Sequence, residues 1–178
     1  MARPLHAQIN LSALRANLAR ARVVAPGAKV LAVVKANAYG HGLLRVLPAL
    51  DDADGLALVE LDGACQLRDR LPTRRILLIE GFFEERELLE MSQRRLATVV
   101  HSEEQVSLLE RAALPRPLEV FVKVNTGMNR LGLAPSAVAG VCERLSRASS
   151  VSALRLMTHL ARADEEDGLA EPLAVFEE

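Results

Sequence analysis

Six short apolar runs separated by helix-like stretches constrain the fold of this chain more than any other feature of its sequence. Strands and helices that alternate at such short intervals are typical of βα units in a parallel sheet. Because the runs are rich in Val, Leu and Ile and lack a polar face, we expect these strands to be buried on both faces. The runs occupy residues 28–35, 55–60, 74–81, 96–102, 118–127 and 151–160.

Two α/β architectures fit this alternation. One is an open, doubly wound sheet, and the other is a barrel of eight units, which usually needs about 250 residues. The chain has 178 residues and ends inside a helix-like stretch at 171–178. We therefore expect that, if the fold is a barrel, only about six of its βα units are present.

Composition argues against several classes of function. The net charge is −1 and aromatic residues make up 3% of the chain, so no basic stripe with stacking rings predicts a nucleic-acid partner. No apolar stretch reaches the roughly 20 residues of a membrane span, and the N-terminus has no signal-peptide pattern. We expect a soluble, cytoplasmic protein that binds no membrane.

Polar and ionisable residues follow each predicted strand. The carboxyl ends of parallel strands meet at one edge of a sheet or barrel, where active sites of these folds lie. We therefore expect these side chains to form the site. They are Lys35, Asn37, Tyr39, Glu60, Glu80, His101, Lys123, Asn125, Thr126, Arg130, Thr158 and His159.

Lys35 is the candidate with the clearest chemistry. A lysine amine at the edge of an apolar core can form a Schiff base with a carbonyl, although it can also simply extend to solvent. The turn that follows contains Gly40 and Gly42, and free N–H groups there, with the helix start at Leu43, could hold a phosphate. A Schiff-base lysine beside a phosphate-binding turn suggests pyridoxal 5'-phosphate.

Two further stretches carry candidate residues. Arg130 follows a glycine turn, so its guanidinium could bind a carboxylate. Lys123 lies inside a predicted strand, where a lysine needs a partner or a modification. His159 ends an apolar strand and is either a core histidine or a residue that faces a flat cofactor ring. No metal-ligand spacing, dinucleotide motif or phosphate-binding loop of the nucleotide-binding type occurs.

The segment AVVKANAYGHG, residues 32–42, resembles the cofactor-lysine signature of the alanine racemase family. Residues 9–18, 122–132 and 158–164 resemble three further regions of that family, in the same order along the chain. The resemblance implies a (β/α)8 barrel that binds pyridoxal 5'-phosphate and interconverts L-alanine and D-alanine. It also implies a homodimer that supplies D-alanine for peptidoglycan of the cell wall.

Carried onto this sequence, the resemblance implies a role for each candidate. Lys35 would hold the cofactor covalently and would exchange the α-proton on the D-alanine side. Tyr39 would bind the cofactor phosphate, and His159 would pack near the pyridine ring. Arg130 would bind near the substrate carboxylate. Lys123 would be carbamylated, and the resulting anion would pair with that arginine.

The resemblance also implies parts that this sequence lacks. The second catalytic base of the family is a tyrosine of a C-terminal β-domain, whereas the one tyrosine here is Tyr39. We therefore expect residues 1–178 to form part of an N-terminal cofactor-binding barrel that does not racemise alanine at a useful rate alone. The alternatives are a pyridoxal phosphate carrier or homeostasis protein with a lone barrel, and an inert truncated chain. A related barrel decarboxylase fits the turn at 37–42 less well.

Overall fold

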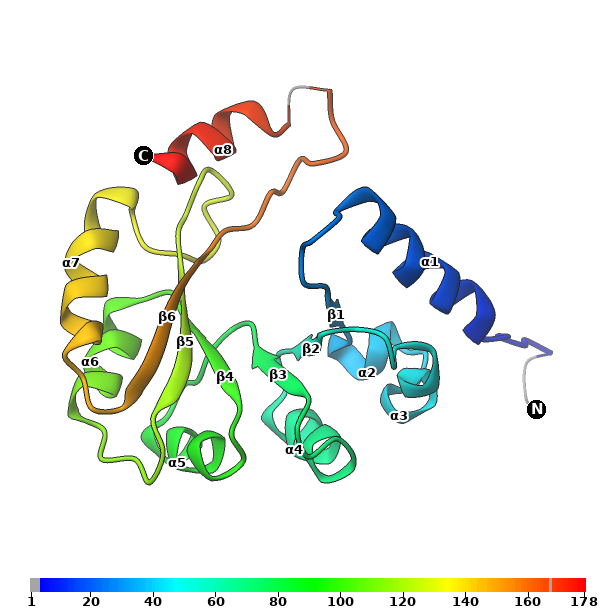
Figure 1. The fold of residues 1–178 in the computed structure, drawn as a ribbon, viewed down its shortest axis with the longest axis horizontal. Coiled ribbons are helices and arrows are strands. Elements are labelled where there is room, and N and C mark those ends of the chain that lie inside the picture. Colours follow the sequence, from blue (N-terminus) through cyan, green and yellow to red (C-terminus); the bar gives the residue numbers. More distant parts are fainter. Residues whose placement is uncertain (1–3, 167) are drawn as a thin grey trace. The chain divides into compact units, whose positions relative to one another are not determined.

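The computed structural model of the chain describes residues 4–166 and 168–178, and these fall into two compact units. The first unit ends at Ile76 and the second begins at Leu77. Both units alternate strands with helices (Figure 1). The expected α/β alternation is therefore confirmed.

The first unit holds two strands and the helices that flank them. Its first helix begins directly after Asn10, whose side chain accepts a hydrogen bond from the N–H of Ala13 at 3.0 Å. Strand β1 pairs in parallel with β2, with Leu31 opposite Gly55 and Val33 opposite Ala57. The elements are α1 (Leu11–Val24), β1 (Leu31–Val33), α2 (Lys35–Tyr39), α3 (Leu43–Val46), the 3-10 helix η1 (Leu47–Ala49), β2 (Gly55–Leu58) and α4 (Leu61–Arg70).

Strand β3 crosses from the first unit into the second, where three parallel pairings follow in chain order: β3 with β4, β4 with β5, and β5 with β6. Helices α6 and α7 lie along the same side of β5 and β6 (Figure 1). Arg144 on α7 joins these helices through Glu103 at 2.8 Å and Glu110 at 2.7 Å, both on α6. The elements are β3 (Arg75–Leu78), α5 (Glu85–Gln93), β4 (Ala97–Val100), α6 (Glu103–Arg111), β5 (Leu118–Lys123), α7 (Pro135–Ser146), β6 (Val151–Met157) and α8 (Ala170–Glu177).

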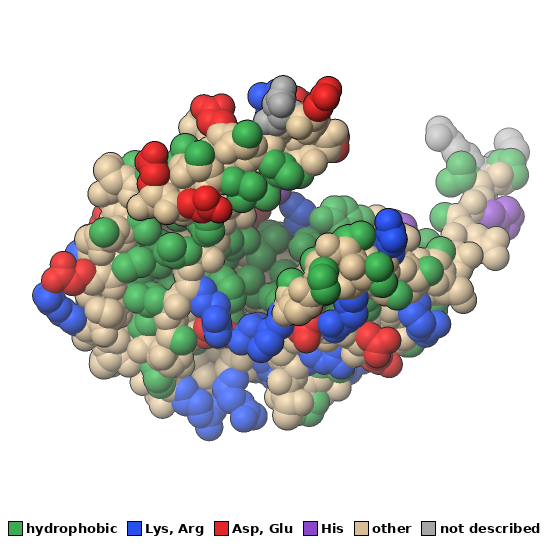
Figure 2. Space-filling view, turned by 45° about the horizontal axis from the view of Figure 1, so that its top comes forward, with side chains coloured by type: hydrophobic (Ala, Val, Ile, Leu, Met, Phe, Trp, Pro, Cys, Tyr) green, Lys and Arg blue, Asp and Glu red, His purple; other side chains and the backbone are tan. Residues whose placement is uncertain are grey.

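Burial matches the prediction for β2 and β4, which are wholly buried, and largely for β3 and β5. The prediction of burial is wrong for β1 and β6, where Val33 is 44% exposed and Leu156 is 49% exposed. Each of these two side chains lines an open pocket within its own unit, so no neighbour covers it. Apolar side chains accordingly reach the surface between charged ones (Figure 2).

Among the described residues, no helix combines the length and the apolar character that a bilayer crossing needs.

Candidate functional site

Lys35 follows β1 and is half-buried. The backbone is fixed on both sides of it by the end of the neighbouring strand. The Val34 N–H donates to the Ala57 carbonyl at 2.7 Å, and the Ala36 N–H donates to the Glu60 carboxylate at 2.8 Å. The sequence therefore places a lysine at a strand end, as expected, and the fold holds its main chain firmly.

The segment after Lys35 forms a left-handed helical turn. Ala36, Asn37 and Ala38 have φ values of 51–54° and ψ values of 47–50°, and Tyr39 has a φ of 54°. Left-handed helical geometry costs roughly 1–2 kcal/mol for each residue with a Cβ atom. Four such residues in a row therefore persist only because surrounding bonds hold them.

Gly40 and Gly42 also have positive φ values, as their identity suggests, but the expected use of their N–H groups is wrong. The N–H groups of Gly40 and Gly42 donate to backbone carbonyls of the same turn, both at 2.9 Å. The Leu43 N–H donates to the Asn37 side chain at 2.7 Å. The left-handed turn thus uses these donors itself, and none of the three is left for a phosphate.

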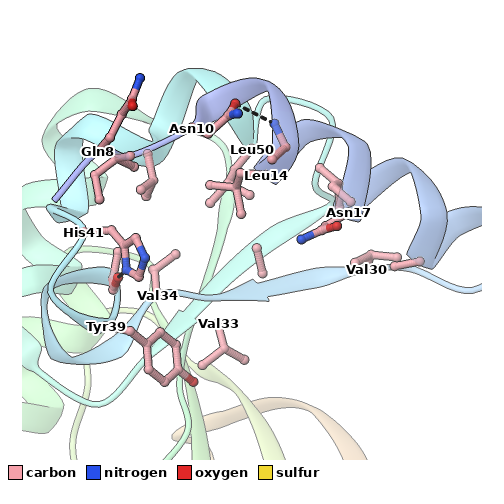
Figure 3. A pocket seen from close by; sticks show the side chains of 17 residues that line it. Gln8, Asn10, Leu14, Asn17, Val30, Val33, Val34, Tyr39, His41 and Leu50 are labelled. Atoms are coloured by element: carbon pink, nitrogen blue, oxygen red, sulfur yellow. Dashed lines mark hydrogen bonds between the residues drawn. The ribbon is translucent and has the colours of Figure 1, made fainter.

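The Tyr39 side chain is an accessible polar group of this turn. It is 59% exposed and lies at the edge of a pocket of about 510 Å³ between α1 and β1. Figure 3 shows the Tyr39 and His41 rings on the side of this pocket formed by the turn, with Asn17 coming from α1 and Asn10 from the position just before it. The His41 Nδ1 atom contacts the Ala38 carbonyl oxygen at 2.8 Å, which ties this ring to the turn.

In the second unit, the residues after β5 form a closed loop that carries Arg130. The Asn125 N–H donates to the Leu133 carbonyl at 2.9 Å, and the Leu133 N–H donates to the Lys123 carbonyl at 2.8 Å. Inside the loop, the Asn125 Oδ1 atom accepts the N–H of Asn129 at 3.0 Å. Arg130 is exposed on this braced loop, so its guanidinium is accessible to an anionic group from solvent.

Lys123 is the last residue of β5 and is only 5% exposed. The sequence-based view that this lysine lies inside the sheet is confirmed. A buried ammonium group needs an interaction partner, and the Lys123 side chain is not without one in this structure.

The ends of β5 and β6 are joined by two hydroxyl groups. Thr126 and Thr158 share a hydrogen bond between their Oγ1 atoms at 2.7 Å, and Thr158 also donates to the Val124 carbonyl at 3.1 Å. His159 follows directly and is exposed. The threonine pair thus fixes the main chain next to the histidine.

The structure groups the candidates by unit. Lys35 and Tyr39 lie in one turn of the first unit, whereas Lys123, Arg130 and His159 lie at the ends of β5 and β6 in the second. Their placement at strand ends agrees with the sequence analysis. The sequence did not predict the hydrogen bonds of Glu60 and of the threonine pair; it indicated only that these residues follow strands.

Comparison with known proteins identifies the family of the chain. Residues 9–178 match the family model described as "Alanine racemase, N-terminal domain". The chain is 46% identical to the alanine racemase of Erwinia tasmaniensis and 47% identical to a catabolic alanine racemase of Klebsiella aerogenes. Each alignment covers 100% of this chain and 50% of the relative, so the chain spans about half the length of these curated relatives.

A solved structure gives the same result for the fold. The biosynthetic alanine racemase of Pseudomonas aeruginosa superimposes with a TM-score of 0.88 at 41% sequence identity, over 93% of this chain and 47% of that one. The expected fold class, part of an alanine racemase barrel, is therefore confirmed. The chain belongs to the alanine racemase family, in the region of that family's N-terminal domain.

Proposed function

We propose that this chain forms the cofactor-binding part of an alanine racemase that interconverts L-alanine and D-alanine with pyridoxal 5'-phosphate. The observation that supports this most is the half-buried Lys35, whose main chain is held by bonds to Ala57 of β2 and to the Glu60 side chain. A nucleophilic amine must be presented in a fixed direction, and a main chain held at this point would favour that.

The residues present fit the cofactor. The amine of Lys35 would join the cofactor aldehyde with loss of water, and the exposed Tyr39 hydroxyl would bind its phosphate. When bound, the cofactor draws electron density from the α-carbon of an amino acid and so makes its proton removable. Because the Gly40 and Gly42 amides are already bonded, we assign the phosphate contact in this turn to Tyr39 alone.

The other residues would act on the substrate. Lys35 would accept or return the α-proton on the D-alanine side, and Arg130 would hold the substrate carboxylate with its planar fork of N–H donors. A carbamate on Lys123 would turn a buried cation into an anion that orients Arg130, and His159 would pack against the pyridine ring. We further propose a cytoplasmic homodimer that supplies D-alanine for peptidoglycan.

The chain has three lysines, which makes the central assignment easy to test. The protein is incubated with pyridoxal phosphate, reduced with borohydride and mapped by mass spectrometry. We expect the label on Lys35 and not on the exposed Lys29, and we expect Lys35→Ala to remove it while Lys29→Ala leaves it. Equal labelling of both lysines would show that surface amines react at random and would refute the assignment.

A second measurement separates a racemase from a cofactor carrier. The loaded protein is incubated with D-alanine in deuterium oxide, and the deuterium at the α-carbon is followed by NMR. A racemase site in which Lys35 serves this enantiomer exchanges the proton of D-alanine faster than that of L-alanine. A carrier, which binds no amino acid, leaves the α-protons of both enantiomers in place.

A further inference from the structure

Glu60 directly precedes helix α4 but does not cap it. It occupies the N-cap position of α4, yet its side chain makes no capping hydrogen bond to that helix. Residues at this position are usually Ser, Thr, Asp or Asn, and they satisfy the first N–H groups of their own helix. The Glu60 carboxylate instead accepts the N–H of Ala36 at 2.8 Å.

The Ala36 N–H that Glu60 accepts belongs to the peptide group directly after Lys35. The Ala36 N–H belongs to the planar peptide group that joins Lys35 to Ala36, so fixing it fixes the backbone rotation on the carboxyl side of Lys35. On the amino side, the Val34 N–H is held by the Ala57 carbonyl of β2 at 2.7 Å. The carboxylate of Glu60 thus continues, with a side chain, the row of bonds that β2 makes to β1.

The left-handed turn needs this support at its start. Its far end is closed by its own backbone, because the Gly40 N–H donates to the Ala36 carbonyl and the Gly42 N–H to the Asn37 carbonyl, both at 2.9 Å. A further bond, from the Ala38 N–H to the Val34 carbonyl at 2.9 Å, spans Lys35, but none of these three bonds uses the Ala36 N–H. At the Lys35 end, the Ala36 N–H reaches outside the turn, and the group that it meets is Glu60.

We propose that Glu60 is a positioning residue, which holds the peptide group after Lys35 and so sets the direction in which the lysine amine points at the cofactor aldehyde. This inference rests on the proposed function of Lys35. Glu60 touches neither cofactor nor substrate in this scheme; it acts through the main chain.

The test uses three variants of the 178-residue chain. Glu60→Ala removes the acceptor, whereas Glu60→Gln removes the charge and keeps an oxygen that can accept the Ala36 N–H. Asp62→Ala is the matched control, since it removes another exposed carboxylate two residues further along the chain. Both positions are exposed to solvent, so the variants should fold.

The first readout needs no cofactor. Amide hydrogen exchange at Ala36, measured by NMR, should become at least about tenfold faster in Glu60→Ala, because the N–H loses a charge-assisted bond. It should stay within about threefold of the parent in Glu60→Gln and in Asp62→Ala. Unchanged exchange in Glu60→Ala would overturn the inference.

The second readout is the rate at which excess pyridoxal phosphate forms its coloured adduct with Lys35. We expect Glu60→Ala to slow this step about tenfold and Glu60→Gln to restore it to within about threefold of the parent. If exchange at Ala36 rises but the adduct forms at the parental rate, Glu60 braces the turn without positioning the lysine, and the inference is wrong. If the parent chain itself forms no adduct, the proposed function and this inference both fall, while the exchange data still report the hold of Glu60 on the turn.

Discussion

Replacing Ala36 with glycine should stabilise the protein, which is the opposite of what the same change does in an ordinary helix. Ala36 is exposed and has a φ of 51° and a ψ of 50°. Glycine adopts this geometry without the Cβ clash, which relieves roughly 1–2 kcal/mol of strain. The greater freedom of glycine in the unfolded chain returns about 0.4–1 kcal/mol of this. The expected net gain in the free energy of unfolding is therefore about 0.8 kcal/mol at the middle of these two ranges.

The matched control is Ala16→Gly in the same unit. Ala16 is also exposed but lies in the interior of the right-handed helix α1, where glycine should lower stability by about 1 kcal/mol. Urea unfolding followed by circular dichroism gives both values from the same transition. The two variants should shift the midpoint in opposite directions. If Ala36→Gly destabilises the protein as much as Ala16→Gly, the reasoning from left-handed strain is refuted.

The same Ala36→Gly variant should label more slowly at Lys35 in the borohydride experiment. Glycine allows the backbone next to the lysine more conformations, so the amine spends less time in the reactive direction. A variant that is more stable but less reactive would show that strain at this turn serves the site at the expense of stability.

Four further substitutions have outcomes that can be measured. Gly81→Ala should destabilise the second unit by more than about 2 kcal/mol, because Gly81 has a φ of +79° and a Cβ atom there would overlap a backbone oxygen of β4. Gly140 lies in α7 with open space around it, so Gly140→Ala should stabilise the same unit by about 0.5–1 kcal/mol. Thermal or urea unfolding measures both changes. The hydrogen bond from Arg144 lowers the pKa of Glu110 from its usual value of 4.5, so this pair stabilises the fold at neutral pH and loses its effect as the pH falls through the acid range below that value. Arg144→Met should therefore reduce the free energy of unfolding at pH 7 and make its decline in acid less steep. An unchanged pH profile of stability would contradict this. Tyr39→Phe should weaken binding of pyridoxal phosphate in a titration but leave that of pyridoxal, which has no phosphate, unchanged; equal losses for both would exclude a phosphate contact.

Much of the fold could be read from the sequence because local signals and the tertiary structure agree. The Asn10 side chain caps α1, and Ser102 caps α6 by accepting the Gln105 N–H, as their residue types predict. The runs that became β2 and β4 are apolar throughout and are buried throughout. In these elements the side chain that favours the local structure also makes the contacts that stabilise it.

The turn after Lys35 shows where such reasoning stops. Alanine and tyrosine have no preference for the left-handed region, so the residues at 36, 38 and 39 give no hint of its handedness. The bonds that compensate for it come from Glu60, at the end of another strand, and from the Asn37 side chain, which bonds six residues ahead. The handedness therefore depends in part on a tertiary contact, whereas the glycine amides that the sequence suggested were free are bonded within the turn itself.

The prediction that β1 and β6 are buried was wrong for a related reason. Composition tells how apolar a strand is, but exposure depends on what lies against it. Val33 and Leu156 face pockets within their units, although both belong to runs as apolar as the buried ones.

The braced peptide group beside Lys35 also bears on the order in which this protein is assembled. The segment 35–42 on its own would have to adopt four unfavourable residues without the carboxylate that bonds its start, so an isolated peptide of this sequence should be disordered. The lysine gains its fixed direction only once β2 has paired with β1. If Lys35 has the role proposed above, its amine would be presented to an aldehyde only on chains in which these two strands have already paired.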